Sequence, residues 1–350
     1  MFYERKIKLA ILIDDAMYRR TFHHDDLDFL KTFAEIINQP PYPDTIDRGY
    51  MIDNLGDAEA CLTCWGTPAL TKDILDAAPE LKLILHAAGT PKAIVSDEVW
   101  KRGLRVATAA PVIAIDVAET ALGAIIFCLK RLGDYDRIVR TGRWATDYKS
   151  GEVSAVNELK PLIKRLNAYL TVGIIGASHV GKNMIRLLKP FGVNILLYDP
   201  CISASMAREM GVQLASLESL MQISDVVSVH TPKLPSTYHM ITAAHLSSMK
   251  DGALFVNTSR GSNVDQDALL EELKSGRIHA YLDVFDEEPL PAVNAFIELD
   301  NVLLTPHISG GHTVNGGFER GNYIIDQLYR YCCTGRLENE TLEDMISMMA

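Results

Sequence analysis

The sequence is short of several features that mark special classes of protein. Six cysteines in 350 residues are too few for the disulfide framework of a small secreted domain. Basic residues number 34 against 45 acidic ones, and this net charge of -11 argues against nucleic acid or an anionic membrane surface as the main partner. The longest apolar run, near ALGAIIFCL, is too short to span a bilayer. We therefore expect a cytoplasmic protein without a membrane segment.

A metal or redox centre is not expected either. Cys61 and Cys64 form a CxxC motif, but no second cysteine pair accompanies it. The surrounding stretch EACLTCWGTP is typical of a strand that ends in a turn. We assign these thiols to the core.

The length and composition favour two domains of ordinary globular type. Apolar residues make up 48% and charged residues 23% of the chain, which allows large cores. In the first third, strand-like runs such as KIKLAILID, LKLILHAAG and LRVATAA alternate with segments of helical periodicity such as HDDLDFLKTFAEIIN. A long helix is expected from Ile115 or Asp116 to about Arg131. This alternation predicts βαβ units and a parallel sheet.

The alternation restarts more regularly after residue 166. Six strands are expected, YLTVGIIG, VNILLYD, DVVSVHTP, GALFVNTS, RIHAYLDVF and NVLLTPH, with helices between them. Their nearly continuous Val, Ile and Leu content predicts a doubly wound, Rossmann-type sheet covered on both faces. Ligands of such sheets bind beyond the carboxyl ends of the strands. The residues at those ends are therefore the candidates for function.

A near match to the dinucleotide-binding fingerprint follows the first of these strands. In TVGIIGASHVGK, the three fingerprint positions are Gly176, Ser178 and Gly181. The following helix offers unpaired N–H groups and a positive dipole end to a pyrophosphate. The serine is small, and its hydroxyl can donate to a phosphate oxygen. With His179 and Val180, these residues form the candidate cofactor loop, although the His179 imidazole is assigned no chemistry.

An acidic residue at the end of the next strand supports this interpretation. Asp199 lies 18 residues after Gly181, in NILLYDP. A carboxylate there hydrogen-bonds ribose hydroxyls and repels a 2′-phosphate, which selects NAD over NADP. The alternative role is a turn aspartate before Pro200. The loop and the aspartate together predict NAD as the cofactor.

Other strand ends carry a set of reactive side chains. Arg260 follows the strand in FVNTSRG, Asp283 and Glu288 lie in YLDVFDEEP, and His307 follows the last strand in LLTPHISGG. Arg260 suits a carboxylate as a bidentate partner. His307 suits proton exchange with a carbonyl oxygen during hydride transfer, and Glu288 suits the other ring nitrogen, which favours the protonated imidazole. Asp283 is a candidate for the nicotinamide carboxamide. Individually each is an ordinary turn or surface residue, but together they suggest reduction of a 2-keto acid.

These motifs, in this order, resemble the D-isomer-specific 2-hydroxyacid dehydrogenase family. The matching stretches are the glycine loop, LLYDP, VSVHTP, FVNTSRG, DVFDEEPLP and NVLLTPHISGG. The resemblance implies a catalytic set of Arg260, Glu288 and His307. It also implies that NAD is bound by the glycine loop, Asp199, His230 and Asp283, and the candidate cofactor set is completed by Thr231, Pro232 and Thr258.

The resemblance further implies the organisation of the chain. A flavodoxin-like substrate domain would comprise residues 1–118 and 312–350, and an NAD-binding domain residues 119–311. The backbone of Ala88, Gly89 and Thr90 would bind the substrate carboxylate together with Arg260. A homodimer would form through the cofactor domain, with an arm near residues 140–166. The substrate would be a small 2-keto or 2-hydroxy acid.

Four departures from the family pattern affect the substrate more than the reaction. Ser178 replaces a glycine, and the HAAGTPK loop lacks the usual second glycine and the aspartate after it. His86 stands at a basic position that phosphoglycerate enzymes use, and Ile113 stands where asparagine is usual. Two alternatives stay open. The same fold and residues resemble corepressors that use NAD to control assembly. A formate-oxidising relative is disfavoured, because that chemistry pairs glutamine, not Glu288, with histidine.

Overall fold

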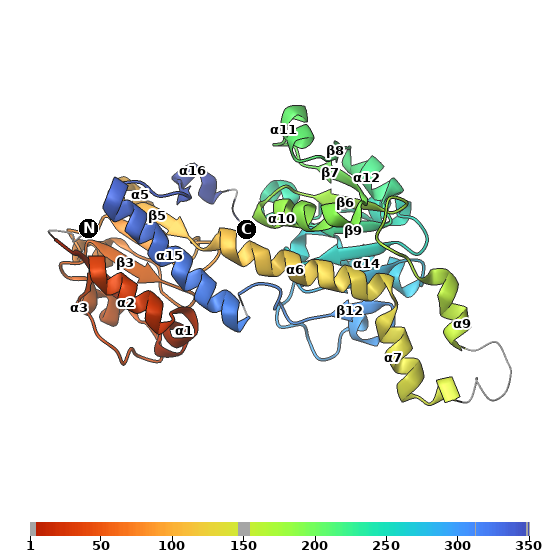
Figure 1. The fold of residues 1–350 in the computed structure, drawn as a ribbon, viewed down its shortest axis with the longest axis horizontal. Helices are drawn as coiled ribbons and strands as arrows, with labels where there is room; N and C mark the ends of the chain where they lie inside the picture. The colour runs from red at the N-terminus through yellow and green to blue at the C-terminus, as the bar shows by residue number, and fades with distance from the viewer. Residues whose placement is uncertain (1–4, 146–154, 312, 348, 350) are drawn as a thin grey trace. The chain divides into compact units, whose positions relative to one another are not determined.

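The computed structural model describes residues 5–145, 155–311, 313–347 and 349 (Figure 1). Two compact units divide the chain. Unit 1 comprises Met1–Asp116 and Gly310–Ala350, and unit 2 comprises Val117–Ser309. The segment expected to form an arm, residues 140–166, lies partly outside the described residues.

Unit 1 is built on a six-stranded sheet in the order β13-β5-β4-β3-β1-β2. Five strands are parallel, and β13 pairs antiparallel with β5 at one edge. The parallel order 2-1-3-4-5 is that of a flavodoxin-like fold, which confirms the expected fold class for this part of the chain. The strands are β1 (Ile7–Leu12), β2 (Ala34–Ile36), β3 (Ala60–Thr63), β4 (Leu83–His86), β5 (Arg105–Thr108) and β13 (Glu340–Thr341).

Helices cover both faces of this sheet because its strands are apolar on both sides. In β1, Leu9 and Ile11 belong to one buried cluster, whereas Ala10 and Leu12 belong to another. The first cluster includes residues of α2 and α15, and the second includes residues of α3, α4 and α5. The helices of unit 1 are α1 (Asp15–Thr21), α2 (His24–Phe33), α3 (Arg48–Leu55), α4 (Lys72–Asp76), α5 (Asp97–Lys101), α15 (Val314–Thr334) and α16 (Glu343–Ile346).

The sequence interpretation was wrong at three elements of unit 1. The single helix expected over residues 24–38 ends at Phe33, and Ala34–Ile36 instead forms the edge strand β2. The short helices α1 and α3 were not expected. Each begins after an aspartate whose side chain accepts a hydrogen bond from the first turn, Asp14 for α1 and Asp47 for α3.

Unit 2 is built on a parallel sheet in the order β12-β11-β10-β9-β6-β7-β8. This Rossmann-type order reverses direction between β6 and β9, which is the switch point where such sheets bind ligands. The sheet has seven strands instead of the expected six, because Gln213–Leu214 adds a two-residue edge strand. The strands are β6 (Thr171–Ile175), β7 (Asn194–Tyr198), β8 (Gln213–Leu214), β9 (Val226–Val229), β10 (Leu254–Asn257), β11 (His279–Leu282) and β12 (Val302–Leu304).

Helices of unit 2 cover both faces of this sheet. One buried cluster contains residues of α10 and the second half of α6, and the other contains residues of α12, α13 and α14. Both layers therefore seal the sheet from water. The helices are α6 (Ala110–Leu129), which begins in unit 1, α7 (Leu132–Arg140), α9 (Ala155–Leu159), α10 (His179–Leu188), α11 (Ala204–Glu209), α12 (Leu217–Ile223), α13 (Ala243–Ser248) and α14 (Gln266–Lys274).

Helix α6 is longer and more apolar than expected. It starts at Ala110 instead of Ile115, and it is a candidate membrane span by length and composition alone. The core helix of a soluble protein has the same properties. Five of its residues are buried against β6, β7 and α10 in the core of unit 2: Ala118, Ala121, Ala124, Ile125 and Leu129.

Candidate active site

The candidate residues of unit 2 all follow the carboxyl ends of its parallel strands. The glycine loop follows β6, Asp199 follows β7, and His230 follows β9. The three candidate catalytic residues follow adjacent strands, Arg260 after β10, Glu288 after β11 and His307 after β12. The carboxyl edge of this sheet therefore holds both the candidate cofactor-binding residues and the candidate catalytic residues.

The glycine loop has a backbone that explains which positions must be glycine. Gly176 has φ +94°, and Gly181 is so close to the turn that a Cβ there would lie 2.0 Å from the carbonyl oxygen of Gly176. Ser178, by contrast, has φ -60°. An L-residue adopts this conformation without strain. The serine therefore does not distort the loop.

Ser178 is also the N-cap of α10, which begins with His179 and Val180. Its Oγ accepts a hydrogen bond of 3.4 Å from the amide of Gly181. Serine is among the preferred residues at this position, because it satisfies one of the orphan amides of the first turn. The hydroxyl proton stays available to a phosphate oxygen.

Asp199 ties the glycine loop to the turn after β7. One carboxylate oxygen accepts from the amide of Ala177 at 2.7 Å, and the other accepts from the amide of Cys201 at 2.8 Å. The carboxylate is therefore fixed beside the glycine loop. Each oxygen has a second lone pair, so the group can still accept hydrogen bonds from ribose hydroxyls.

His230 is packed inside the protein. Its side chain is 3% exposed, its Nε2 pairs with Ser228 Oγ at 2.9 Å, and its buried Nδ1 has no hydrogen-bond partner among the residues that the structure describes. Burial lowers the pKa of His230 to about 3, so the imidazole is neutral. Its main chain lies against the glycine turn, 3.0 Å from a Cβ built at Gly176. Because the side chain is buried, only the backbone of His230 would contact a cofactor.

Three further candidate cofactor residues lie at neighbouring strand ends. Thr231 follows His230 and accepts from Asn263 Nδ2 at 2.9 Å, and Pro232 comes next. Thr258 directly follows β10 and holds a buried Oγ1 without a partner among the described residues. A buried hydroxyl group without a hydrogen bond destabilises the fold unless a ligand or a water molecule supplies the bond. Thr258 therefore suits contact with a polar ligand.

Arg260 is held by the turn that follows β10. Asn257 Nδ2 donates to the carbonyl of Arg260 at 2.9 Å, and the Arg260 Nη1 donates to the Ser259 carbonyl at 2.6 Å. A Cβ on Gly261 would lie 2.1 Å from the Phe285 carbonyl carbon, so this turn packs directly on the segment that leads to Glu288. Burial lowers the pKa of Arg260, and the Glu288 charge opposes that shift. The guanidinium and the carboxylate are thus electrostatic neighbours.

Glu288 and His307 form the direct contact of the site. His307 Nδ1 lies 2.7 Å from Glu288 Oε2, and the other oxygen of Glu288 accepts from the amide of Phe285 at 2.9 Å. The His307 side chain is 49% exposed, so its ring can meet a ligand. His307 adopts φ +54°, a conformation that is uncommon for a residue other than glycine.

Asp283 accounts for the unusual backbone at His307. It is fully buried, and its carboxylate accepts from Thr305 Oγ1 at 2.5 Å and from the amides of Ile308 and Ser309, both at 2.9 Å. The carbonyl of Asp283 also accepts from the His307 amide at 2.8 Å. These bonds encircle His307, so Asp283 positions the imidazole. We did not expect this role from the sequence, because its main partners are backbone amides.

The candidate substrate loop, Ala88 to Thr90, belongs to unit 1 and follows β4. Among the described residues, its three amides have no acceptor, and consecutive free amides at a strand end suit an anion. His86 is the last residue of β4, and its Nδ1 lies 3.0 Å from Thr63 Oγ1. Burial lowers the pKa of His86 to about 4, so it contributes no positive charge at neutral pH.

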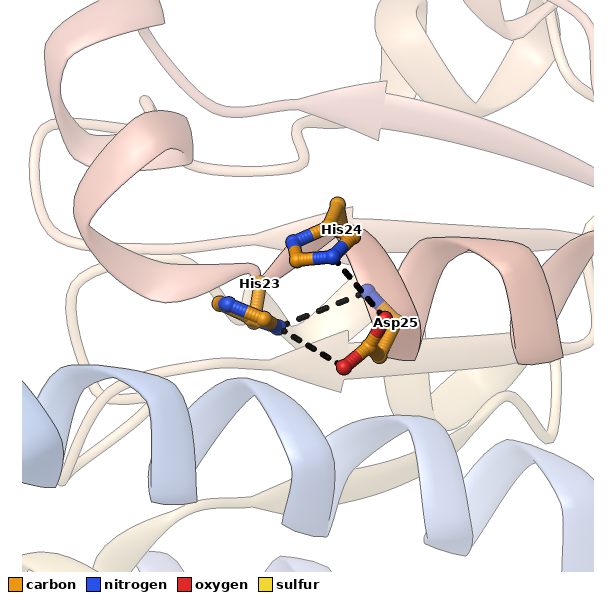
Figure 2. A group of neighbouring side chains, drawn as sticks. All are labelled: His23, His24 and Asp25. Atoms are coloured by element: carbon orange, nitrogen blue, oxygen red, sulfur yellow. Dashed lines mark hydrogen bonds and ion pairs between the residues drawn. The ribbon is translucent and has the colours of Figure 1, made fainter.

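One group of possible metal ligands lies elsewhere in unit 1 (Figure 2). His23 Nδ1 and His24 Nε2 lie 3.5 and 3.0 Å from the carboxylate of Asp25. The group is exposed at the start of α2, and His23 Nδ1 accepts from the Asp25 amide as a helix cap. A cation there would oppose the positive end of the helix dipole. We assign the group to capping.

The residues at the carboxyl edge of the unit 2 sheet fit a dinucleotide. Gly176 and Gly181 leave room that a Cβ would fill, and the first turn of α10 offers amides to a pyrophosphate. The unpartnered Thr258 hydroxyl and the fixed Asp199 carboxylate supply polar groups for the rest of the ligand. The described residues are therefore consistent with NAD at this edge.

Comparison with known proteins supports the same conclusion. Residues 122–309 match the family described as D-isomer specific 2-hydroxyacid dehydrogenase, NAD binding domain. A glyoxylate reductase of Korarchaeum cryptofilum is 34% identical over 81% of this chain and 80% of its own length. A D-3-phosphoglycerate dehydrogenase of Methanocaldococcus jannaschii is 29% identical over 97% of this chain and 60% of its own length. The apo D-mandelate dehydrogenase of Rhodotorula graminis superposes with a TM-score of 0.80 at 25% identity, over 97% of this chain and 98% of that one. This chain therefore belongs to the D-isomer-specific 2-hydroxyacid dehydrogenases, NAD-dependent oxidoreductases that act on CH–OH groups.

Proposed function

We propose that this enzyme works as a 2-keto acid reductase in which His307 is the acid and the base. The observation that carries the proposal is the 2.7 Å contact between His307 Nδ1 and Glu288 Oε2. An ionised carboxylate only accepts hydrogen bonds, so Nδ1 carries the shared proton. The other ring nitrogen, Nε2, is therefore the atom that exchanges a proton with the substrate.

The reaction needs one hydride and one proton. The glycine loop and Asp199 would hold NADH, which would supply a hydride to the carbonyl carbon of the keto acid and become NAD⁺. His307 donates the Nε2 proton to the carbonyl oxygen, which gives the 2-hydroxy acid and a neutral imidazole. Glu288 stabilises the imidazolium that precedes this transfer. In the reverse direction, the neutral imidazole takes the proton of the hydroxyl group.

Arg260 binds the substrate carboxylate in this proposal. A guanidinium keeps its charge and matches a carboxylate with two parallel donors. Its half-buried position strengthens the attraction, because less water screens the charge.

Asp199 selects the cofactor. Its carboxylate is held in place by the amides of Ala177 and Cys201, so it cannot easily turn away from a 2′-phosphate. Repulsion between the two negative groups disfavours NADPH. We expect NADH to be preferred.

The test is the oxidation of NADH by the purified enzyme with a panel of 2-keto acids. We expect turnover, and we expect Arg260→Ala to raise KM and lower kcat, with a combined loss in kcat/KM of about a hundred-fold or more. Arg208→Ala removes an exposed arginine of the same unit and serves as the control. If no keto acid is reduced although NADH binds, the proposal fails and the corepressor-like alternative is favoured.

We also propose a cytoplasmic homodimer. Helix α7 and its neighbourhood in unit 2 carry exposed apolar side chains, including Leu132, Val139 and Trp144. Such residues are more typical of an interface than of a solvated surface. Light scattering after size exclusion should give twice the chain mass, and Val139→Glu should shift the protein toward the monomer. A wild-type monomer at micromolar concentration would contradict the dimer.

A further inference from the structure

We propose that unit 2 holds a second ligand site, at the amino edge of its sheet where the strands begin, and that this site binds a free amino acid with an apolar side chain. The candidate active site lies at the opposite, carboxyl edge of the same sheet. The inference goes beyond the proposed reaction and does not depend on it.

The site is a cavity of about 320 Å³. It is lined by the end of α6, the start of α7 and the starts of β11 and β12, which pair in the register Ala280 to Val302. Pockets that bind small molecules range from about 300 to 1,000 Å³. The volume therefore favours a ligand closer in size to an amino acid than to a dinucleotide.

One part of the lining is apolar. It comprises Phe127 of α6, Leu299, and Val302 and Leu303 of β12. Phe127 is 37% exposed, and the other three side chains are only partly buried against the core. A ligand with an apolar side chain would remove more of this surface from water, which favours binding.

Arg131 supplies a cation to the cavity. It joins α6 to α7 with φ +55°, a conformation that is uncommon outside glycine and that often marks a functional position. Its Nη1 lies 2.6 Å from His279 Nε2, and its Nε forms an ion pair with Asp134. Its Nη2 has no partner among the residues that the structure describes. The guanidinium can therefore still donate to a carboxylate oxygen of a ligand.

His279 contributes no charge to the cavity. Burial lowers its pKa to about 4, and the neighbouring charge of Arg131 adds to this shift. The ring is therefore neutral at neutral pH and accepts the hydrogen bond that Arg131 donates, because a guanidinium only donates. The charge balance of the cavity depends on its arginines and aspartates alone.

Two carboxylates balance the two arginines of the lining. Asp134 pairs with Arg131 and also with Arg137 Nη2 at 2.6 Å, and Asp300 pairs with Arg137. The Asp300 side chain is 85% exposed, so its carboxylate can accept further hydrogen bonds. The lining thus offers charges of both signs with no net charge. A zwitterion matches this pattern, whereas a polyanion would meet the two carboxylates and a polycation the two guanidinium groups.

These groups assign a place to each part of an amino acid. The carboxylate would bind Arg131, the ammonium group would bind Asp300, and the side chain would lie against the apolar lining at Phe127. A molecule that keeps only one of the two charged groups would lose one charge-assisted hydrogen bond. The expected consequence is binding weaker by about ten-fold or more.

The test is calorimetric titration of the purified enzyme at neutral pH with L-leucine and L-phenylalanine. Two matched probes, 4-methylpentanoate and 3-methylbutylamine, keep the leucine side chain with only the carboxylate or only the ammonium group. We expect saturable binding of at least one amino acid, and binding about ten-fold or more weaker for both matched probes. No saturable binding of either amino acid up to about 10 mM, or equal binding of a matched probe, would overturn the inference.

Two variants locate the ligand. Arg131→Ala should abolish saturable binding, and Arg131→Lys should retain part of it. Arg131 also contacts groups of the fold, so Asp300→Asn, at an exposed carboxylate, tests the site separately and should weaken amino acid binding about five- to ten-fold. Asp251→Asn, at another exposed carboxylate that pairs with an arginine, is the control and should bind as the wild type does. Light scattering checks that every variant keeps the oligomeric state of the wild type.

The active site is the other place where a carboxylate could bind, and Arg260→Ala tests it. We expect amino acid binding to be unchanged in Arg260→Ala and in the presence of a saturating 2-keto acid. Loss of binding in either case, or wild-type binding in Asp300→Asn, would overturn the inference. Absent binding with normal keto acid reduction would overturn this inference alone, and normal binding without reduction would overturn only the proposed reaction.

Discussion

His307 Nδ1 lies 2.7 Å from Glu288 Oε2, and the second oxygen of Glu288 is fixed by the Phe285 amide. The carboxylate therefore cannot turn away from the imidazole without losing a backbone hydrogen bond. This arrangement sets the orientation of the ring and occupies Nδ1, so Nε2 is the ring nitrogen left for the substrate. It gives the proposed chemistry a defined donor atom.

Replacing Glu288 by glutamine tests this orientation. The amide keeps the shape of the side chain but removes the negative charge that stabilises the imidazolium. We expect Glu288→Gln to lower kcat about ten- to a hundred-fold. Glu287→Gln, at the exposed neighbouring position, should behave like the wild type. Equal kcat values for both variants would remove Glu288 from the mechanism.

Asp283 offers a separate test, because it holds the loop around His307. In Asp283→Asn, the new amide NH₂ would face donors at Thr305, Ile308 or Ser309, and at least one hydrogen bond would be lost. We expect a loss of about 1–3 kcal/mol in the free energy of unfolding together with a fall in kcat. Urea unfolding and initial rates measure the two effects. Asp251→Asn, at an 88% exposed carboxylate, is the control and should leave both unchanged.

The glycine loop predicts opposite results for two neighbouring positions. A Cβ at Gly181 would lie 2.0 Å from the Gly176 carbonyl oxygen, so Gly181→Ala should displace the turn and raise the KM for NADH at least ten-fold. Ser178→Gly should cost only a few tenths of a kcal/mol, because glycine is a tolerable N-cap. Fluorescence titration with NADH compares the two. Equal affinities in both variants would show that the loop does not contact the cofactor.

Buried histidines predict acid sensitivity. The pKa of His86 is lowered by burial to about 4, below its ordinary value of 6.5, so the unfolded chain binds the proton more readily. The stabilisation is present above pH 6.5 and is lost as the pH falls toward 4. Between pH 7 and 5, this group should remove about 2 kcal/mol from the free energy of unfolding.

The variant His86→Gln should lose that dependence. Its free energy of unfolding should fall less than that of the wild type between the same two pH values, by about 2 kcal/mol. His24→Gln changes an exposed imidazole and should keep the wild-type dependence. If His86→Gln responds to acid as the wild type does, His86 is not the group responsible.

The fold class could be predicted because apolar runs and helical periodicity alternate along the chain. Errors arose where local patterns were short or ambiguous. The apolar spacing of AEII suits a helix and an edge strand equally, and only pairing with β1 decides for the strand. Helix α1 has seven residues and depends on the Asp14 cap, a signal that many turns share.

The site was predictable to a different extent. The carboxyl-edge argument paired Glu288 with His307, and the two side chains are in contact in the structure. The positioning role of Asp283 and the close packing of Gly261 were missed, because their partners are backbone atoms that carry no sequence signature. The only sequence signal for the close packing was the presence of a glycine directly after Arg260.

The most direct test of the account is the single-turnover rate of NADH oxidation with a saturating 2-keto acid in His307→Asn. The amide keeps polarity but cannot supply a proton at neutral pH, so we predict a rate lower by about 10²- to 10⁴-fold, with NADH affinity unchanged. A variant rate within a few-fold of the wild type would contradict the role of His307 as the acid and base.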